Sequence, residues 1–357
     1  MRTAAIVLLL LSSLACSAQV NDMPRPAPDF PKDVVWLDQG APVPHALKDY
    51  RGRVLLIDFW EYTCINCIRD FTVVKRWYRK YHPYGFEVIG IHFGEFPMGH
   101  NAENVARAAR RLQLPWPVVA DVHGAAWGAF GSNVWPNRYL IGPRGSIELQ
   151  VEGEGNNRQM EQVIRNMLAK SHPEVKQIAL DPDEAAFAPR CGRTTDETYV
   201  GDWFGRGAVQ QSHKKGTTAE FVAGKEPKDG GVVLAGRWRI EQDGATSSQP
   251  PAGLEESATL KYHARSLYAV LSVAGSGHPV RVTLLQDGQP LTPQNAGKDV
   301  QFDGANSYVE VGEPRMYYLL KNPAFGQHTL LLKPLAAGFT LHSFTYGNDC
   351  QQDFDQP

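Results

Sequence analysis

The sequence predicts an α/β domain followed by an all-β domain of the jelly-roll or sandwich type. From residue 34 to about residue 170, short apolar runs alternate with helical periods, which is typical of a largely parallel sheet covered by helices. Beyond residue 190 no helical period recurs, and short β-rich runs are separated by clusters of Gly, Pro, Asp and Asn. A length of 357 residues also suits two domains. The β-rich runs include 258–263, 267–273, 316–320 and 329–332.

The composition is ordinary for a globular protein and excludes two broad classes. Hydrophobic residues make up 43% of the chain and charged residues 21%. This is enough apolar material for real cores, so a mainly disordered chain is excluded. Lys and Arg number 36 against 38 Asp and Glu, for a net charge of -2. The basic excess typical of polyanion binding is absent, and we expect no nucleic-acid partner.

Residues 1–18 have the pattern of an export signal. Arg2 precedes an apolar run at 4–11, and small residues follow it. The run is too short to span a bilayer. Two interpretations stay open. Cleavage at the end of the segment would release a periplasmic or secreted protein. Alternatively, residues 13–16 resemble a lipobox, which would leave Cys16 as a lipidated N-terminus. Either way, we expect the mature chain in an oxidising compartment.

Shifts in composition suggest the domain boundaries. We expect a proline-rich spacer at 19–31, the α/β domain at 32–170 and a linker at 171–190 that carries three prolines and a run of acids. The all-β domain is expected at 191–350, with a short tail at 351–357.

The most informative motif is a C-x-x-C pair, Cys64 and Cys67, placed where a buried strand ends and a helix begins. Residues 54–60 form an almost continuous apolar run, as expected for a strand buried on both faces. The free N–H groups and partial positive charge of the helix N-terminus favour a thiolate at Cys64. The spacing keeps Cys67 close enough to attack a mixed disulfide formed there. The motif predicts Cys64 as nucleophile and Cys67 as resolving thiol, with no cofactor beyond their own disulfide.

Four charged side chains are candidate contributors to this site. Asp58 lies in the apolar strand, where burial should raise its pKa and let it exchange a proton with Cys67. A hydrogen-bonded core carboxyl is the alternative for Asp58. Glu61 and Glu95 are candidate acidic neighbours, and Arg69 in the first helical turn is a candidate to raise the thiolate content. Solvated surface positions are the alternative for these three.

Other uses of the C-x-x-C pair fit the sequence less well. A zinc site needs further ligands, and Cys191 and Cys350 do not form a second C-x-x-C. A c-type haem site needs His at the position that Ile68 occupies. A purely structural disulfide within the motif stays open. We expect no metal.

Short segments in both predicted domains match a known family. The segments are 52–60, 62–69, Trp135-Pro136, 136–145 and 153–156 in the first domain, and 195–201 and 344–347 in the second. Those of the first domain resemble a thioredoxin-like fold of the TlpA-type extracytoplasmic branch, and more closely the thioredoxin-like region of DipZ-type proteins. Those of the second resemble the β domain that follows this region in DipZ-type proteins.

The resemblance implies a role for a proline and a source of electrons. It implies that Trp135-Pro136 is a cis peptide that faces the cysteines and shapes the substrate groove, where backbone polar groups can pair with an extended chain. DipZ-type proteins also carry a membrane-embedded electron-carrying part that is not found in this sequence. The implied donor is therefore a separate membrane protein of the CcdA or DsbD type, or a small thiol. Residues 63–67 depart from the Trp-Cys-Gly-Pro-Cys of thioredoxin, so its redox potential does not transfer.

The second predicted domain carries two further cysteines and has several open roles. Cys191 and Cys350 flank it, and domain termini often lie close together, so we expect a structural disulfide between them. An electron relay from the C-x-x-C pair is the alternative. Jelly-roll domains attached to enzymes often bind glycans, so a glycan ligand, a docking or dimer surface and an architectural lid all stay open.

Together these features predict an exported thiol-disulfide oxidoreductase that reduces disulfides in periplasmic proteins. Cys64 would attack, Cys67 would resolve and Asp58 would assist proton transfer. The reducing direction rests on analogy with TlpA-type relatives. One alternative is a thiol peroxidase, although the P-x-x-x-T-x-x-C arrangement of peroxiredoxins is missing. The other is a glycan- or protein-binding protein with an accessory redox domain.

Overall fold

The computed structural model describes most of the chain. The described residues are 25–37, 43–182, 192–202, 207–224, 226–248, 255–275 and 278–348. The predicted export signal, Cys16, Cys191 and Cys350 lie outside these ranges, so lipidation and the second disulfide stay predictions. Within the ranges, no helix has both the length and the apolar character needed to cross a membrane.

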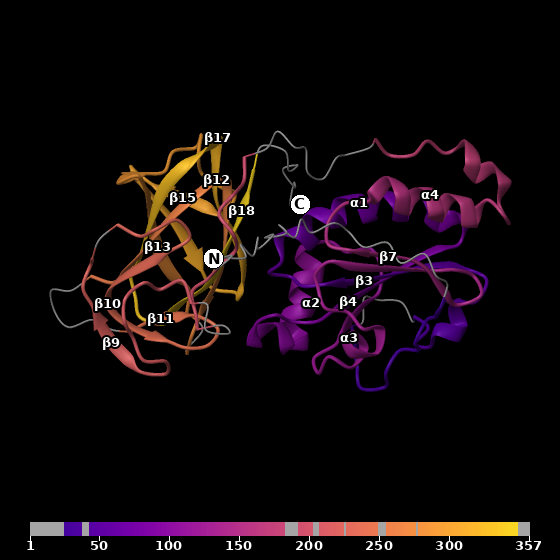
Figure 1. The fold of residues 1–357 in the computed structure, drawn as a ribbon, viewed down its shortest axis with the longest axis horizontal. Helices are drawn as coiled ribbons and strands as arrows, with labels where there is room; N and C mark the ends of the chain where they lie inside the picture. Colours follow the sequence, from indigo (N-terminus) through magenta and orange to yellow (C-terminus); the bar gives the residue numbers. More distant parts are fainter. Residues whose placement is uncertain are drawn as a thin grey trace, which may run out of the picture.

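The described chain forms an α/β part and an all-β part that lie side by side (Figure 1). In the α/β part, seven strands form one sheet in the order β1-β7-β6-β3-β4-β5-β2. The strands are β1 (Arg25–Pro26), β2 (Val35–Leu37), β3 (Val54–Trp60), β4 (Phe86–His92), β5 (Val118–Ala120), β6 (Asn137–Ile141) and β7 (Ser146–Glu152).

The sheet is mixed, which corrects the prediction of a largely parallel one. Strands β3, β4 and β5 pair in parallel. The pairs β3–β6, β6–β7, β1–β7 and β2–β5 are antiparallel. The difference arises because a tight turn at residues 142–145 joins β6 to β7 as a hairpin, without the crossover helix that a parallel pair requires.

Helices cover both faces of this sheet. They are α1 (Ile65–Tyr81), α2 (Ala102–Arg111), α3 (Ala125–Phe130) and α4 (Asn157–Leu168), with short 3-10 turns η1 (Leu47–Tyr50), η2 (His82–Tyr84), η3 (Pro97–His100) and η4 (Pro173–Gln177). Helices α1, α2 and α4 share one buried cluster with one face of the sheet, and α3 belongs to a cluster on the other face. The Asn101 side chain accepts hydrogen bonds from the backbone N–H groups of Glu103 and Asn104 and so caps α2, a position at which Asn is a favoured residue.

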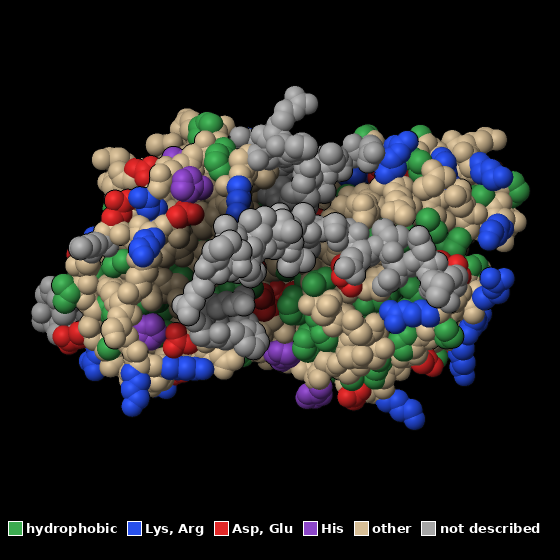
Figure 2. Space-filling model, in the orientation of Figure 1, with side chains coloured by type: hydrophobic (Ala, Val, Ile, Leu, Met, Phe, Trp, Pro, Cys, Tyr) green, Lys and Arg blue, Asp and Glu red, His purple; other side chains and the backbone are tan. Residues whose placement is uncertain are grey.

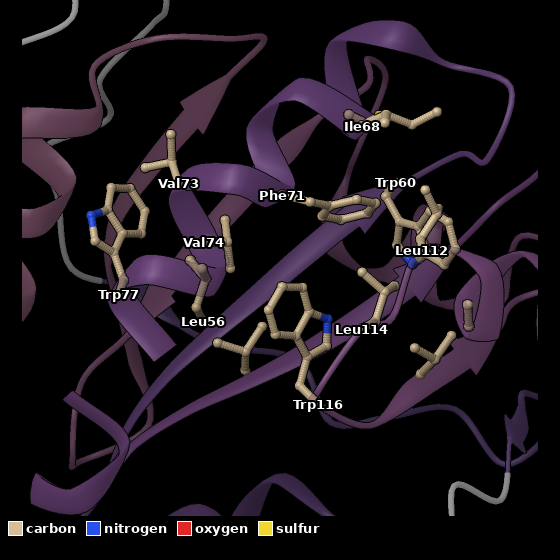
Figure 3. Packing of buried hydrophobic residues seen from close by; sticks show 14 of the residues in the cluster. Leu56, Trp60, Ile68, Phe71, Val73, Val74, Trp77, Leu112, Leu114 and Trp116 are labelled. Atoms are coloured by element: carbon tan, nitrogen blue, oxygen red, sulfur yellow. The ribbon is translucent and has the colours of Figure 1, made fainter. Parts of the chain in front are cut away.

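The central strand β3 joins the two clusters. All seven of its residues are buried, and alternate side chains point to opposite faces. Leu56 and Trp60 enter the cluster under α1, whereas Leu55 and Phe59 enter the cluster on the α3 side. Figure 3 shows Phe71 and other side chains of α1 packed on the first of these faces. The strand therefore holds the start of α1 in a fixed place.

The second part is all-β, as predicted. Its strands are β8 (Thr198–Tyr199), β9 (Thr218–Phe221), β10 (Val232–Ile240), β11 (Ala245–Ser247), β12 (Ser257–Val273), β13 (Val280–Gln286), β14 (Gln289–Pro290), β15 (Val300–Asp303), β16 (Asn306–Val311), β17 (Arg315–Pro334) and β18 (Phe339–Gly347). They form one 11-stranded sheet around a separate core. Strands β12 and β17 pair along most of their lengths, with register shifts near Ser266. Each replaces two of the shorter runs expected from sequence, because such irregularities bend a strand without ending it.

The two parts share buried side chains. Tyr268 of β12, with Met316 and Tyr318 of β17, belongs to the same core cluster as Ile65 and Ile68 of α1. Figure 2 shows acidic side chains in the region where the two parts meet. Arg69, near the start of α1, interacts electrostatically with Tyr268, so the all-β part lies near the end of α1 that carries the cysteines.

Candidate functional site

The two cysteines of the motif lie together at the N-terminus of α1. Cys64 is the N-cap residue and is half-buried, whereas Cys67 is buried one turn later. Both are free thiols. Burial raises the pKa of Cys67, and its hydrogen bond to Cys64 and the charges of Cys64 and Asp58 act in the same direction. The outer sulfur is therefore the accessible one, and the inner sulfur needs a proton acceptor to react.

Asp58 lies beneath the cysteines in β3 and is fully buried. Burial raises the pKa of its carboxyl well above the usual range, the charge of Asp70 adds to this, and Arg138 partly offsets it. Among the described residues, Oδ1 of Asp58 has no hydrogen-bond partner. A buried carboxyl with a raised pKa exchanges a proton with Cys67 in both directions. Its carboxylate form accepts the thiol proton, which is what the resolving step requires, and its acid form returns one.

A second buried carboxyl, Asp70, was missed by the sequence analysis. Its Oδ2 lies 3.1 Å from Nη1 of Arg138, and burial raises its pKa to about 6. Arg138 also donates to Asn157 Oδ1 at 2.8 Å and to the Gly155 carbonyl at 2.6 Å. The β3–β6 register sets Arg138 opposite Asp58. The one available signal was a carboxyl three residues after Cys67, on the inward face of α1.

Glu61 shapes the loop that leads into Cys64. It is fully buried, and its Oε2 accepts hydrogen bonds from the backbone N–H of Thr63 at 2.5 Å and from the Thr63 hydroxyl. Its other oxygen lies 3.5 Å from Nε2 of His92, which accepts a hydrogen bond from the backbone of Tyr62 at 3.3 Å. The solvated position considered as the alternative is therefore wrong for Glu61, and the carboxylate positions the residue before the nucleophile.

Arg69 is clamped close to the cysteine pair. Its Nε and Nη2 donate to the two carboxylate oxygens of Glu154 at 2.8 and 3.0 Å, and Nη2 also donates to Asn66 Oδ1 at 2.6 Å. The guanidinium interacts electrostatically with Cys64 and with Tyr268 of the all-β part. The guanidinium is therefore a fixed, buried cation near the outer sulfur.

Trp135 and Pro136 directly precede β6. Their peptide bond is cis, as the resemblance implies. The Trp135 ring packs on Trp127, with ring centroids 4.6 Å apart, and touches the same buried cluster as Cys64. The Pro136 carbonyl accepts a hydrogen bond from Gly153 at 2.8 Å. The two strands that follow the cis bond are thus tied to the Gly153–Gly155 turn that also supplies Glu154.

Glu95 lies at the junction with the all-β part. The Tyr199 hydroxyl is 2.5 Å from Oε1 of Glu95 and 3.1 Å from Oε2 of Glu197. Burial and the charge of Glu197 raise the pKa of Glu95 to about 8, with Glu61 adding to the effect and the Tyr199 hydrogen bond opposing it. One hydroxyl proton cannot serve two carboxylates, so the cluster retains a carboxyl proton near neutral pH.

The described residues contain no group of three or more His, Cys, Asp or Glu side chains placed to hold a metal ion.

Replacing Asp58 by Asn tests its buried carboxyl. Its folded-state pKa is raised, so the folded protein holds a proton that the unfolded chain has lost, and wild-type stability falls as pH rises. We expect Asp58→Asn to be more stable than wild type by about 1–2 kcal/mol at pH 8, with a smaller difference at pH 5. Denaturant unfolding across this range measures it, with exposed Asp33→Asn as control. A difference that shrinks towards alkaline pH contradicts the assignment.

Replacing Glu95 by Gln tests the carboxyl cluster at the junction. Glu61, Glu197 and Tyr199 face Glu95, and its folded pKa of about 8 lies above the ordinary value of 4.5. Stability is therefore lost as pH rises through this interval. We expect the fall in melting temperature between pH 5 and pH 9 to be smaller in Glu95→Gln than in wild type, by roughly 2–4 °C. Exposed Glu310→Gln serves as control, and equal falls in all three proteins rule the cluster out.

Comparison with known proteins matches both parts of the chain. Residues 23–150 match the model of the AhpC/TSA family, and residues 195–347 match a model described as "Thioredoxin like C-terminal domain". The protein DipZ of Mycobacterium tuberculosis is 31% identical over 330 residues, which cover 90% of this chain and 43% of DipZ. The chain thus spans less than half the length of this relative.

Two further matches each cover less than half of the chain. The thiol-disulfide oxidoreductase ResA of Geobacillus thermodenitrificans is 28% identical over 175 residues, which cover 47% of this chain and 94% of ResA. A solved thioredoxin-like protein in its oxidised form is 20% identical, with a TM-score of 0.35, over 41% of this chain and 95% of its own. The sequence matches extend along both parts in the expected order. The chain is a DipZ homologue in which a thioredoxin-like redoxin domain is followed by a DipZ-type C-terminal β domain.

Proposed function

We propose that this chain is an exported thiol-disulfide oxidoreductase that reduces disulfides in other exported proteins. The observation that carries the proposal is a half-buried Cys64 hydrogen-bonded to a buried Cys67, whose pKa is raised in part by the charge of the buried Asp58. This arrangement separates the attacking sulfur from the resolving sulfur and supplies a proton acceptor for the latter. The similarity to a relative named as a thiol-disulfide oxidoreductase supports the same chemistry.

The reaction balances without a cofactor beyond the two thiols. The Cys64 thiolate attacks one sulfur of the substrate disulfide, so a mixed disulfide forms and the other substrate sulfur leaves as a thiolate. The carboxylate form of Asp58 takes the proton of Cys67, whose thiolate then attacks the sulfur of Cys64 and releases the second substrate sulfur as a thiolate. The protein ends as the Cys64–Cys67 disulfide, and the substrate has gained two electrons and two protons. A separate donor, which we propose to be a membrane protein of the CcdA or DsbD type, must restore the dithiol.

Export through residues 1–18 would bring the chain to such substrates. Lipidation at Cys16, a structural Cys191–Cys350 disulfide and Trp135-Pro136 as one side of the substrate groove belong to the same proposal. Glycan binding by the C-terminal domain has less support, because Trp238, Tyr262 and others of its aromatic side chains are buried in its core.

The two cysteines have different predicted phenotypes. Cys67→Ser should trap the substrate on Cys64 as a lasting mixed disulfide, because the resolving sulfur is gone. Cys64→Ser should trap nothing and should reduce a peptide disulfide no faster than the uncatalysed reaction. Non-reducing mass spectrometry of the prereduced variants after mixing with a disulfide peptide measures both. A mixed disulfide found on Cys67 in the Cys64→Ser protein would contradict the assigned order of attack.

Arg69 has a predicted effect on the nucleophile. Losing the clamped guanidinium in Arg69→Gln should slow alkylation of Cys64 by iodoacetamide at pH 7 by roughly threefold to tenfold, as expected for about 1 kcal/mol of charge interaction. Iodoacetamide is uncharged, so the effect reports the thiolate and not attraction of the reagent. Exposed Arg79→Gln on the same helix should react at the wild-type rate. Equal slowing in both variants would assign the effect to the helix as a whole.

A further inference from the structure

The helix turn that carries the cysteines is covered. The exposed fractions of Thr63, Ile65 and Ile68 are 3%, 1% and 4%, and between positions 63 and 68 only Cys64 and Asn66 are half-buried. A partner disulfide must approach this turn to be attacked. Because its neighbours Thr63 and Ile65 are buried, Cys64 is accessible only through a narrow opening in the surface.

The C-terminal β domain contributes side chains to the apolar cluster in which this turn is buried. Tyr268 of β12 with Met316 and Tyr318 of β17, which we call the tyrosine wall, packs in one buried cluster with Ile65 and Ile68. The two tyrosine rings lie against each other, with centroids 4.5 Å apart. These side chains come from about 200 residues further along the chain, so no isolated redoxin domain could supply them.

Polar contacts hold the wall against the redoxin domain. Arg111 Nη1 lies 3.0 Å from a carboxylate oxygen of Glu313, and Arg107 Nε lies 4.0 Å from the other oxygen. Glu313 comes three residues before Met316 on the chain. At another point of the junction, the hydroxyl of Tyr199 in the all-β part donates a hydrogen bond to Glu95 of the redoxin domain. These contacts lie at separate points of the junction between the two domains and hold the wall in a fixed position near the cysteines.

The wall also lies close to Arg69, the charged side chain near Cys64. Arg69 interacts electrostatically with both Cys64 and Tyr268. Because Arg69 is fixed by Glu154, Tyr268 stands at a defined side of the cysteine pair. Displacing the wall would expose its own apolar side chains, which are buried in the cluster that includes Ile65 and Ile68, at a cost in free energy.

We propose that the tyrosine wall selects the class of substrate. The site accepts a disulfide in a small molecule or in a flexible, extended segment, and excludes a disulfide held on the surface of a folded domain. A narrow chain reaches Cys64 past the wall, whereas a globular surface meets the wall first. The inference rests on the proposed reductase function and adds the substrate class to it.

A matched pair of probes tests the selection. One probe is a small folded domain with a single surface disulfide, and the other is a flexible peptide that carries the same disulfide loop. Each is mixed with the prereduced full chain for a single turnover, and each rate is divided by the rate with dithiothreitol, which removes differences in intrinsic reactivity. The Cys64–Cys67 dithiol supplies the two electrons and two protons that the probe gains.

We expect the normalised rate for the peptide to exceed that for the folded domain at least ~30-fold in the wild-type chain. Glu313→Arg sets a third positive charge against Arg107 and Arg111 and should loosen the wall, so the ratio should fall at least ~5-fold through faster reduction of the folded probe. Exposed Glu310→Arg makes the same charge change without those partners and should keep the wild-type ratio. Met316→Asp places a charge in the apolar cluster and should displace the wall more strongly than Glu313→Arg does.

Three outcomes are distinct. A wild-type chain that reduces both probes at similar normalised rates overturns the substrate class. A ratio that stays high in both Glu313→Arg and Met316→Asp overturns the role of the wall. A wild-type chain that reduces neither probe, although its cysteines are reduced, overturns the proposed reductase function instead.

Discussion

One cation for two buried carboxyls is the constraint on which the rest of the site depends. Asp58 and Asp70 share the interior with Arg138, and the strand and helix that carry them are packed on apolar cores. Two ionised carboxylates would leave one charge uncompensated, which is costly in such a place. The carboxyl nearer to Cys67 therefore has a raised pKa, which makes its carboxylate form a stronger base for the thiol proton. Because β3 is buried on both faces and leads directly into α1, this proton-exchanging group and the resolving thiol are held together before any substrate arrives.

The same principle operates at the domain junction. Glu95 and Glu197 share the single hydroxyl of Tyr199, and Glu61 lies near enough to raise the pKa of both. Glu61 in turn holds Thr63, the residue before the nucleophile. The contact between the domains and the shape of the cysteine loop are thus linked through one set of carboxyls. Docking of the β domain is part of how the active-site loop is built.

The features that could be predicted from sequence depend on near neighbours along the chain. The C-x-x-C pair at a strand-to-helix junction, the buried carboxyl at Asp58 and the Asn101 cap are of this kind. The antiparallel pairing of β3 with β6, the salt bridge of Asp70 with Arg138 and the clamp of Arg69 by Glu154 join residues about 70 to 85 positions apart. No periodicity or spacing encodes which distant residue completes such a contact, so these features required the structure.

The cover over the cysteines did leave a trace in the sequence. In a strand with one solvated face, apolar and polar residues alternate, whereas a strand buried on both faces is continuously apolar. The runs 267–271 and 316–320 are continuously apolar. One set of alternate side chains, which includes Leu267, Ala269 and Tyr317, enters the core of the β domain, and Tyr268, Met316 and Tyr318 between them enter the core of the redoxin domain. The second apolar face of β12 and β17 is therefore explained by the redox site that it covers.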